Sequence, residues 1–134
     1  MDLQIPRFFR VWCKSKKKKT FQIQTAKEVF DLAREKNATA LEFLDELAKV
    51  NARATSNIIV AYDPELITIG GSVALNNPQF TIAGIKKYVD HYLKLPKIQT
   101  TKLGDHIGLL GAAAAVFQKE KGAWGAVLLA KKLG

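Results

Sequence analysis

The stretch Asp63–Asn76, which reads DPELITIGGSVALN, contains a short β-type run that ends in two glycines. Leu66–Ile69 is the apolar part of this run, and Gly70-Gly71-Ser72 follows it directly. Paired glycines leave main-chain N–H groups uncovered, so a flat or anionic ligand can approach the backbone closely. In α/β proteins, nucleotides bind beyond the carboxyl end of a strand, where these glycines lie. A tight turn without a ligand uses the same residues, so the motif alone leaves both interpretations open.

Helical periodicity precedes the motif. Apolar residues recur at helical spacing through Ala38–Val60, which predicts one long helix that ends at Asp63-Pro64. Farther upstream, Thr25 and Glu28 have the spacing of a capping box, in which each side chain bonds the main chain near the other. A second helix is therefore expected to begin there. Its buried face is expected to consist of Ala26, Val29, Phe30 and Ala33.

The chain that follows the motif predicts a second strand between two helices. A stripe of Ile82, Ile85, Val89 and Tyr92, with His91 beside it, predicts a helix that Pro96 terminates. Lys97–Thr101 is expected to be a strand next to Leu66–Ile69, with the latter strand buried. Gly108–Val116 is rich in glycine and alanine, which favours a helix packed near this small sheet. The last helix is expected over Ala123–Leu133.

Two separated segments resemble the ROK family of sugar kinases and sugar-responsive regulators. The first is SNIIVAYDPELITIGGSVAL, which ends at Leu75, and the second is LGDHIGLLGAAAAVF at Leu103–Phe117. They stand in the order that the family shows. The resemblance implies an α/β fold that is half of the ribonuclease-H-like fold of the actin and hexokinase superfamily, rich in helix and with a small sheet. Ser72 departs from the family pattern, which usually has a third glycine at that position.

The resemblance also implies a function. It places ATP or ADP at Gly70, Gly71 and Ser72, and it identifies the chain as the carboxyl-terminal, nucleotide-binding half of a glucokinase-like sugar kinase. The sequence contains no "DxGGT" phosphate loop, no cysteine cluster and no residue that matches the family's catalytic aspartate. No catalytic residue and no metal ligand are therefore assigned, and magnesium would be held only together with the missing lobe. The chain is expected to be inactive alone and to bind nucleotide weakly or not at all. A non-catalytic interaction or regulatory half-protein of the family is the alternative.

The resemblance to half of a kinase divides the chain into two segments and predicts that the protein forms an oligomer or binds a partner chain. Residues 1–24 form an amino-terminal segment that is expected to be exposed or in an interface, and residues 25–134 form the lobe. Phe8, Phe9 and Trp12 at one end, and the face Trp124–Leu128 at the other, are the expected exposed apolar groups. Because such patches tend to be buried in interfaces, a homo-oligomer or pairing with a separate amino-terminal kinase lobe is expected.

Length, charge and cysteine content narrow the class of protein. The 134 residues, 48% of them hydrophobic, suffice for one core, and the chain has no apolar run long enough to cross a bilayer. A cytoplasmic protein without a membrane partner is expected. The single cysteine, Cys13, excludes an intrachain disulfide.

The net charge of +9 owes much to the lysine run that ends at Lys19. Such runs can bind phosphate backbones, but without a recognition helix a solvated loop is favoured and no nucleic-acid partner is expected.

Overall fold

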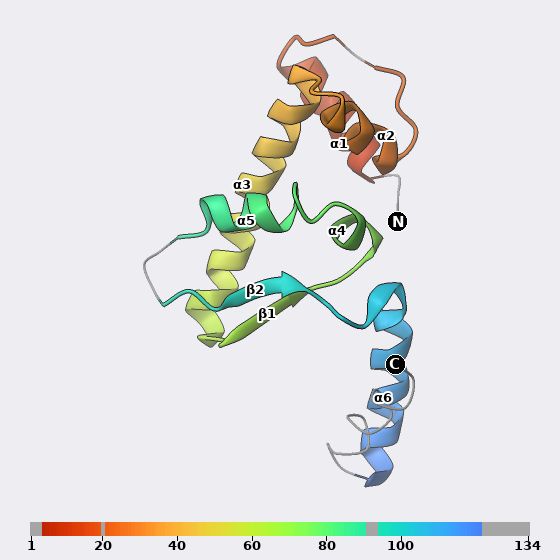
Figure 1. Ribbon diagram of the computed structural model, residues 1–134, viewed down its shortest axis with the longest axis vertical. Helices are drawn as coiled ribbons and strands as arrows, with labels where there is room; N and C mark the ends of the chain where they lie inside the picture. The colour runs from red at the N-terminus through yellow and green to blue at the C-terminus, as the bar shows by residue number, and fades with distance from the viewer. Residues whose placement is uncertain (1–3, 20, 91–93, 122–134) are drawn as a thin grey trace.

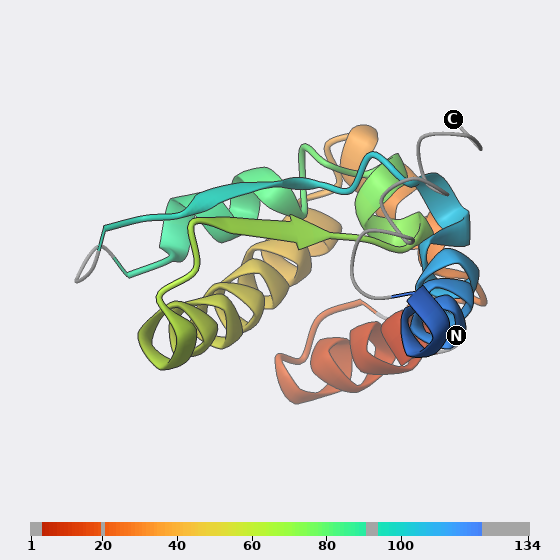
Figure 2. The ribbon, with the colours of Figure 1, turned by 90° about the horizontal axis from the view of Figure 1, so that it is seen from below.

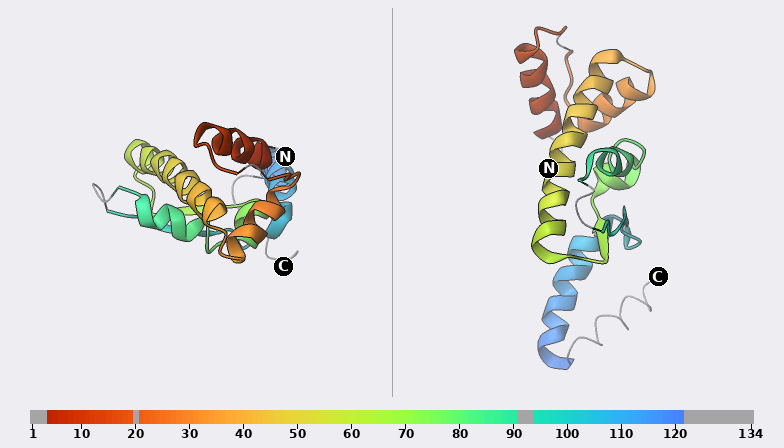
Figure 3. Two further views of the ribbon diagram at one scale, coloured as in Figure 1. Left: turned by 90° about the horizontal axis from the view of Figure 1, so that it is seen from above. Right: turned by 90° about the vertical axis from the view of Figure 1, so that its left-hand side faces the viewer.

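The computed structural model describes residues 4–19, 21–90 and 94–121. Its elements, in chain order, are α1 (Gln4–Ser15), α2 (Ala26–Arg34), α3 (Ala38–Tyr62), β1 (Leu66–Ile69), α4 (Ser72–Asn76), α5 (Ile82–Tyr88), β2 (Lys97–Thr100), the 3-10 turn η1 (Gly104–His106) and α6 (Ile107–Lys121) (Figure 1). The long helix α3 runs through the middle, with α1 and α2 at its amino-terminal end and α5 packed across its central part (Figures 1 and 3). The fold is thus helix-rich α/β with a small sheet, as predicted.

The sheet consists of β1 and β2, paired in parallel with Leu66 opposite Lys97 and Ile69 opposite Thr100. Figure 2 shows this pair of strands lying along one side of α3. Both strands and their adjacency are confirmed, but the expected burial of β1 is wrong. Its residues alternate between exposed and half-buried, and Leu66 is 49% exposed. The physical reason is that the described sheet has only two strands, so helices cover one of its faces and nothing described covers the other.

A second apolar cluster joins this sheet to the helices. Ile98 on β2 packs with Ile59, Ile85 and Val89, all of them at most 4% exposed. The helix α5 ends at Tyr88, and the predicted stripe residue Tyr92 and its neighbour His91 lie outside the described residues. The crossing of α3 and α5 is close, because a Cβ added to Gly84 would lie 2.6 Å from the Cβ of Ala48.

The main core lies at the other end of α3. Its buried members are Phe9, Cys13, Ile23, Val29, Phe30, Ala33, Ala40, Phe43 and Leu44. The capping box at the start of α2 is confirmed: the Glu28 N–H donates to Thr25 Oγ1, and the Glu28 carboxylate accepts from the Gln24 N–H and the Thr25 hydroxyl. Asn37 caps α3 by accepting from the N–H groups of Thr39 and Ala40. Local signals therefore fix where both helices begin.

The amino-terminal segment corrects one expectation. Phe9 is fully buried, with its ring edge-on to Phe43 at 5.0 Å between centroids, and Trp12 also packs edge-on against Phe43. Phe8, by contrast, is 61% exposed, as expected. Successive residues of a helix point about 100° apart, so α1 turns Phe9 and Cys13 into the core and Phe8 away from it. Part of this segment thus belongs to the core rather than to an exterior surface.

The helix predicted over Gly108–Val116 is confirmed as part of α6, and the residue before that range, Ile107, makes its contact beside the end of β1. Ile107 lies against Gly70, where an added Cβ would come within 3.2 Å of the Ile107 Cγ2. From there α6 extends away from the sheet (Figures 1 and 3), and Gly108 and Gly111 have open space around them. Small residues permit close packing but do not by themselves supply a neighbour. The predicted face Trp124–Leu128 lies outside the described residues.

Asp45 is the centre of a polar cluster where α3 meets α5. Its carboxylate accepts from the Tyr88 hydroxyl and the Lys87 ammonium, and it pairs with Lys49 at 3.1 Å. These contacts, the Tyr88 hydrogen bond first, hold the pKa of the Asp45 carboxyl well below its ordinary value. The Asp45 carboxyl therefore has a lower pKa in the folded protein than in the unfolded chain. Its contacts stabilise the folded state fully when the pH is above the pKa of the unfolded chain. This stabilisation is lost as the pH falls from there toward the pKa of the folded protein.

We therefore expect Asp45→Asn to lose up to about 1 kcal/mol of stability at neutral pH, because the cluster is partly exposed. Below about pH 4, where the unfolded carboxyl is protonated, the deficit should shrink. Urea denaturation at several pH values measures both effects. Glu42→Gln, which removes one exposed ion pair with Lys18, is the control. A deficit for Asp45→Asn that stays constant down to pH 2 would contradict the assignment.

Candidate functional site

The glycine loop joins β1 to α4, and its residues serve different purposes. Packing favours a glycine at position 70, because an added Cβ would lie 3.2 Å from the Ile107 Cγ2 and 3.3 Å from the Thr101 Cγ2. Gly71 has a φ of +96°, which disfavours any other residue, yet nothing lies within 4 Å of where its Cβ would stand. Ser72 is the first residue of α4. Of the predicted site, Gly71 is thus the point that is open to close approach.

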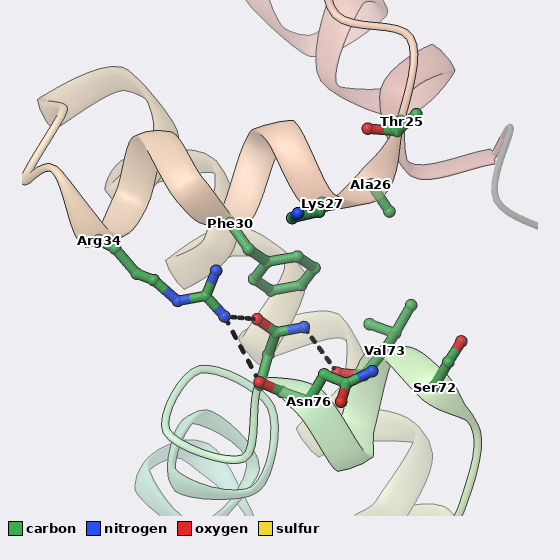
Figure 4. Close-up of a pocket in the computed structure, with 9 residues that line it drawn as sticks. Thr25, Ala26, Lys27, Phe30, Arg34, Ser72, Val73 and Asn76 are labelled. Atoms are coloured by element: carbon green, nitrogen blue, oxygen red, sulfur yellow. Dashed lines mark hydrogen bonds between the residues drawn. The ribbon is translucent and has the colours of Figure 1, made fainter. Parts of the chain in front are cut away.

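Ser72 also lines a cleft of about 430 Å³ between α2 and α4 (Figure 4). The other lining residues are Thr25, Ala26, Lys27, Phe30 and Arg34 on one wall, and Val73, Asn76 and Asn77 on the other. This volume lies within the usual range for small-molecule sites, about 300–1,000 Å³. The cleft places one member of the predicted site against a helix far from it in the sequence.

Helical geometry explains which side chains reach the cleft. The lining residues of α4 include Ser72 and Asn76, which are one turn apart and so share a face. On α2 the same holds for Lys27 and Arg34, which lie two turns apart on the side that faces α4. Sequence reasoning did not find this second wall, because it assigned α2 only a buried face. The spacing was visible in the sequence, but nothing in it indicated that α2 faces α4.

A hydrogen-bond network closes the end of the cleft near Arg34. The Arg34 guanidinium donates to Asn77 Oδ1, to the main-chain oxygen of Asn76 and to the Asp31 carboxylate. The Asn77 amide in turn donates to the main-chain oxygen of Val73 at 3.0 Å. Asn77 is only 6% exposed, so this link is protected from water. The network ties α2 to α4 and holds the two walls at a fixed separation.

The chemistry of the lining favours an anionic ligand with a flat apolar part. Lys27 and Arg34 are cations and no lining residue is acidic, but Arg34 is paired with Asp31, which lies outside the lining. Val73 supplies half-buried apolar surface, whereas the Phe30 ring is only 1% exposed. No histidine, cysteine or carboxylate lines this cleft, so its residues can bind and orient a ligand but offer no general base.

Within the described part of the chain, no three His, Cys, Asp or Glu residues gather into a group that could hold a metal ion. No helix among those residues is long and apolar enough to cross a membrane.

Comparison with known proteins gives consistent matches. The profile of the ROK family matches residues 10–120. A glucokinase of Pyrobaculum calidifontis is 38% identical over 93 residues, which cover 68% of this chain and 31% of the relative. An N-acetyl-D-glucosamine kinase of Haemophilus influenzae is 33% identical over 99 residues, 71% of this chain and 32% of the relative. An N-acetylmannosamine kinase of the same species is 32% identical over 89 residues, 65% and 29% of the two chains. The chain spans about a third of the length of these relatives.

Proposed function

The chain belongs to the ROK family, and from that premise we propose that it is the nucleotide-binding, carboxyl-terminal lobe of an ATP-dependent sugar kinase. The relatives with which it aligns are named glucokinase, N-acetylglucosamine kinase and N-acetylmannosamine kinase, so a hexose or hexosamine is the proposed substrate class. The observation that carries the proposal is the cleft beside Gly71 and Ser72. It combines open backbone, two cations and an apolar middle, which together suit a nucleotide.

In this proposal the nucleotide lies along α4. Its phosphates and ribose approach the backbone at Gly71 and Ser72, within reach of the Lys27 ammonium, and its base lies along the α4 wall beside Val73. Lys27 attracts the phosphates, and the Arg34 network at the opposite end of the cleft keeps the walls apart for the base. Binding to this lobe alone is weak, because no second lobe orders or encloses the phosphates.

Phosphoryl transfer requires more than these residues supply. It needs an aligned sugar hydroxyl, a base and a metal-bound triphosphate in one cleft. No carboxylate lines the cleft, so its residues do not fit a magnesium ion, and we assign the metal to the other lobe of the kinase. The chain's own part is therefore to bind and orient the nucleotide.

An uncovered apolar surface supports assembly with another polypeptide, which is also what the alternative function, a non-catalytic interaction or regulatory protein, requires. Large apolar side chains are exposed on several sides of α3 and on β1, which follows it. They are Val50 at 59%, Ile58 at 45%, Val60 at 66%, Tyr62 at 79% and Leu66 at 49%. Surfaces of this kind are usually buried in interfaces. We propose that a kinase lobe or a second copy of the chain covers it, rather than the terminal segments alone forming the contact.

We expect the purified 134-residue chain to form no sugar phosphate from ATP and glucose, N-acetylglucosamine or N-acetylmannosamine, because it has no base or metal site at the cleft. A coupled assay for ADP release measures this. Amide signals of residues 70–76 should nevertheless shift when ADP is titrated into the labelled protein. Robust sugar phosphorylation would contradict the proposed division of labour, and the absence of any shift would contradict the nucleotide site itself.

A further inference from the structure

We propose that the outer face of α1, together with the lysine run that follows it, binds the surface of an anionic lipid bilayer. The inference goes beyond the proposed kinase function and does not depend on it, because none of these residues lines the cleft between α2 and α4. Attachment to the surface of a bilayer needs no helix that crosses it. The sequence alone predicts a solvated lysine loop and no membrane partner, and the structure adds the side chains that accompany the lysines.

Most of the net charge of the chain lies in one short segment. Residues 7–19 contain seven of the 21 basic residues and no acidic one, whereas the rest of the chain has 14 basic and 12 acidic residues. The seven side chains are all exposed, and they are Arg7, Arg10, Lys14, Lys16, Lys17, Lys18 and Lys19. Clusters of about four to eight basic residues on an amphipathic helix attract the headgroups of anionic lipids.

The end of α1 holds the lysine run beside the helix. Lys17 has a φ of +51°, its N–H donates to the main-chain oxygen of Lys14, and the N–H of Lys18 donates to that of Cys13 at 2.9 Å. These two hydrogen bonds form a Schellman motif, which ends a helix. The Lys18 ammonium also pairs with Glu42 on α3 at 3.0 Å. Among the described residues this is the one ion pair of the segment, so six of its seven cations have no acidic partner there.

The outer face of α1 consists of a basic stripe and an apolar stripe. The inner side of the helix packs on α2 and α3, and the helix lies at the outside of the molecule (Figure 3). Arg7, Arg10 and Lys14 are spaced at i, i+3 and i+7, so they share one stripe. Phe8 and Val11, which are 61% and 59% exposed, form the neighbouring stripe, about 100° farther around the helix.

The apolar stripe favours a bilayer over nucleic acid as the partner. Cations alone attract either polyanion. Proteins that bind nucleic acid without sequence preference track the backbone in a basic groove and stack bases on aromatic rings, whereas α1 is a convex surface and Val11 cannot stack. At a bilayer, Phe8 and Val11 can enter the boundary between headgroups and acyl chains while the neighbouring cations meet the headgroups. Both stripes are then used at once.

The test is co-sedimentation of the purified 134-residue chain with lipid vesicles. We expect the chain to sediment with vesicles of phosphatidylcholine and phosphatidylserine and to stay in solution with vesicles of phosphatidylcholine alone. High salt should release it, because screening weakens the attraction between exposed charges.

Two variants separate the contributions of the stripes. The triple variant Lys14→Gln, Lys16→Gln, Lys19→Gln should weaken binding to the phosphatidylserine vesicles about a hundredfold, because each cation near an anionic surface contributes about fivefold. The other two lysines of the run stay in place, since they form the helix cap and the ion pair. Phe8→Ala should weaken binding by about tenfold, because less apolar surface is removed from water.

Two control variants change the same properties elsewhere on the molecule. Lys86→Gln, Lys94→Gln and Lys102→Gln in one chain remove the same charge from exposed positions, and Leu109→Ala truncates an apolar side chain that is 72% exposed. Both should bind as the wild type does. All the substituted side chains are exposed, so the fold should be kept, which circular dichroism checks. If the triple variant of the lysine run unfolds, the comparison of Phe8→Ala with Leu109→Ala decides the result.

Each other outcome overturns the proposal. Failure of the wild type to bind the phosphatidylserine vesicles does so directly. Equal losses in the two triple variants would assign the attraction to net charge rather than to α1. Unchanged binding of Phe8→Ala would show a surface that attracts polyanions in general, and binding of a DNA duplex with the same dependence on the three lysines would assign it to nucleic acid. None of these results bears on the nucleotide site, which the titration with ADP tests separately.

Discussion

Phe9→Ala is expected to lower the free energy of unfolding by about 3–5 kcal/mol, which is the usual cost of removing a buried phenylalanine ring. Phe9 is fully buried, and its ring contacts Phe43 on α3 and Phe21 in the connection to α2. Truncation would leave a cavity between α1 and α3 and remove both aromatic contacts. Since the free energy of unfolding of a domain is only about 5–15 kcal/mol, this substitution would remove a large part of it.

The neighbouring residue supplies the control. Phe8 has the same side chain on the same helix but is 61% exposed, so Phe8→Ala should change the stability by no more than about 0.5 kcal/mol. Urea denaturation followed by circular dichroism measures both variants. Equal and small losses would show that α1 does not belong to the core and that residues 1–24 are an external segment, as the sequence predicts. Equal and large losses would place Phe8 in a contact that is absent from the structure.

The contrast between Phe8 and Phe9 shows where sequence reasoning reached its limit. Both are large, apolar and adjacent, and nothing in the sequence around them says which one turns toward the core. Their roles depend on Phe43, which approaches from α3. By comparison, the starts of α2 and α3 follow from caps within a few residues, at Thr25 and Asn37, and these were predictable.

The sheet gives a similar lesson about burial. The apolar run Leu66–Ile69 correctly predicted a strand, because that property is local. Its burial required neighbours on its other face and edge, which the described residues do not supply. The helix α6 has the composition of a tightly packed helix, yet it extends away from the sheet, and Gly108 and Gly111 have open space around them. Composition indicates what a surface can pack against, but it does not say that the same chain provides the partner.

The candidate site was half predictable. Gly71 and Ser72 follow from the motif itself, and the structure places both at an open position. At Gly70, contact with Thr101 and Ile107 also favours a glycine, and its place in the site stays a prediction. Lys27 and Arg34 join the site only through the packing of α2 against α4, a contact between segments about forty residues apart that no local pattern encodes.

Gly71→Val is expected to abolish the binding of ADP, through two effects that act together. The φ of +96° is strained for a β-branched residue, at a cost of about 1–3 kcal/mol, and relaxing it would move Ser72 and the start of α4. In addition, the branched side chain would occupy the open space through which a nucleotide approaches the backbone. Gly71→Ala adds the strain with little bulk, so it should weaken binding less than valine does.

Gly104→Val separates the loss of the site from the loss of stability. Gly104 also has a positive φ, +65°, with nothing within 4 Å of an added Cβ. It begins η1, and neither of its chain neighbours lines the cleft, whereas Gly71 directly precedes the lining residue Ser72. Its backbone cost is similar, so both valine variants should unfold at a lower urea concentration than the wild type, by a comparable amount. Only Gly71→Val should lose the ADP-induced shifts of residues 70–76. If Gly71→Val folds and binds ADP as tightly as Gly104→Val does, then the nucleotide does not approach the chain at Gly71, and the open space there has another cause. If both variants lose binding together, the cleft depends on the stability of the whole fold, and the close-approach argument fails.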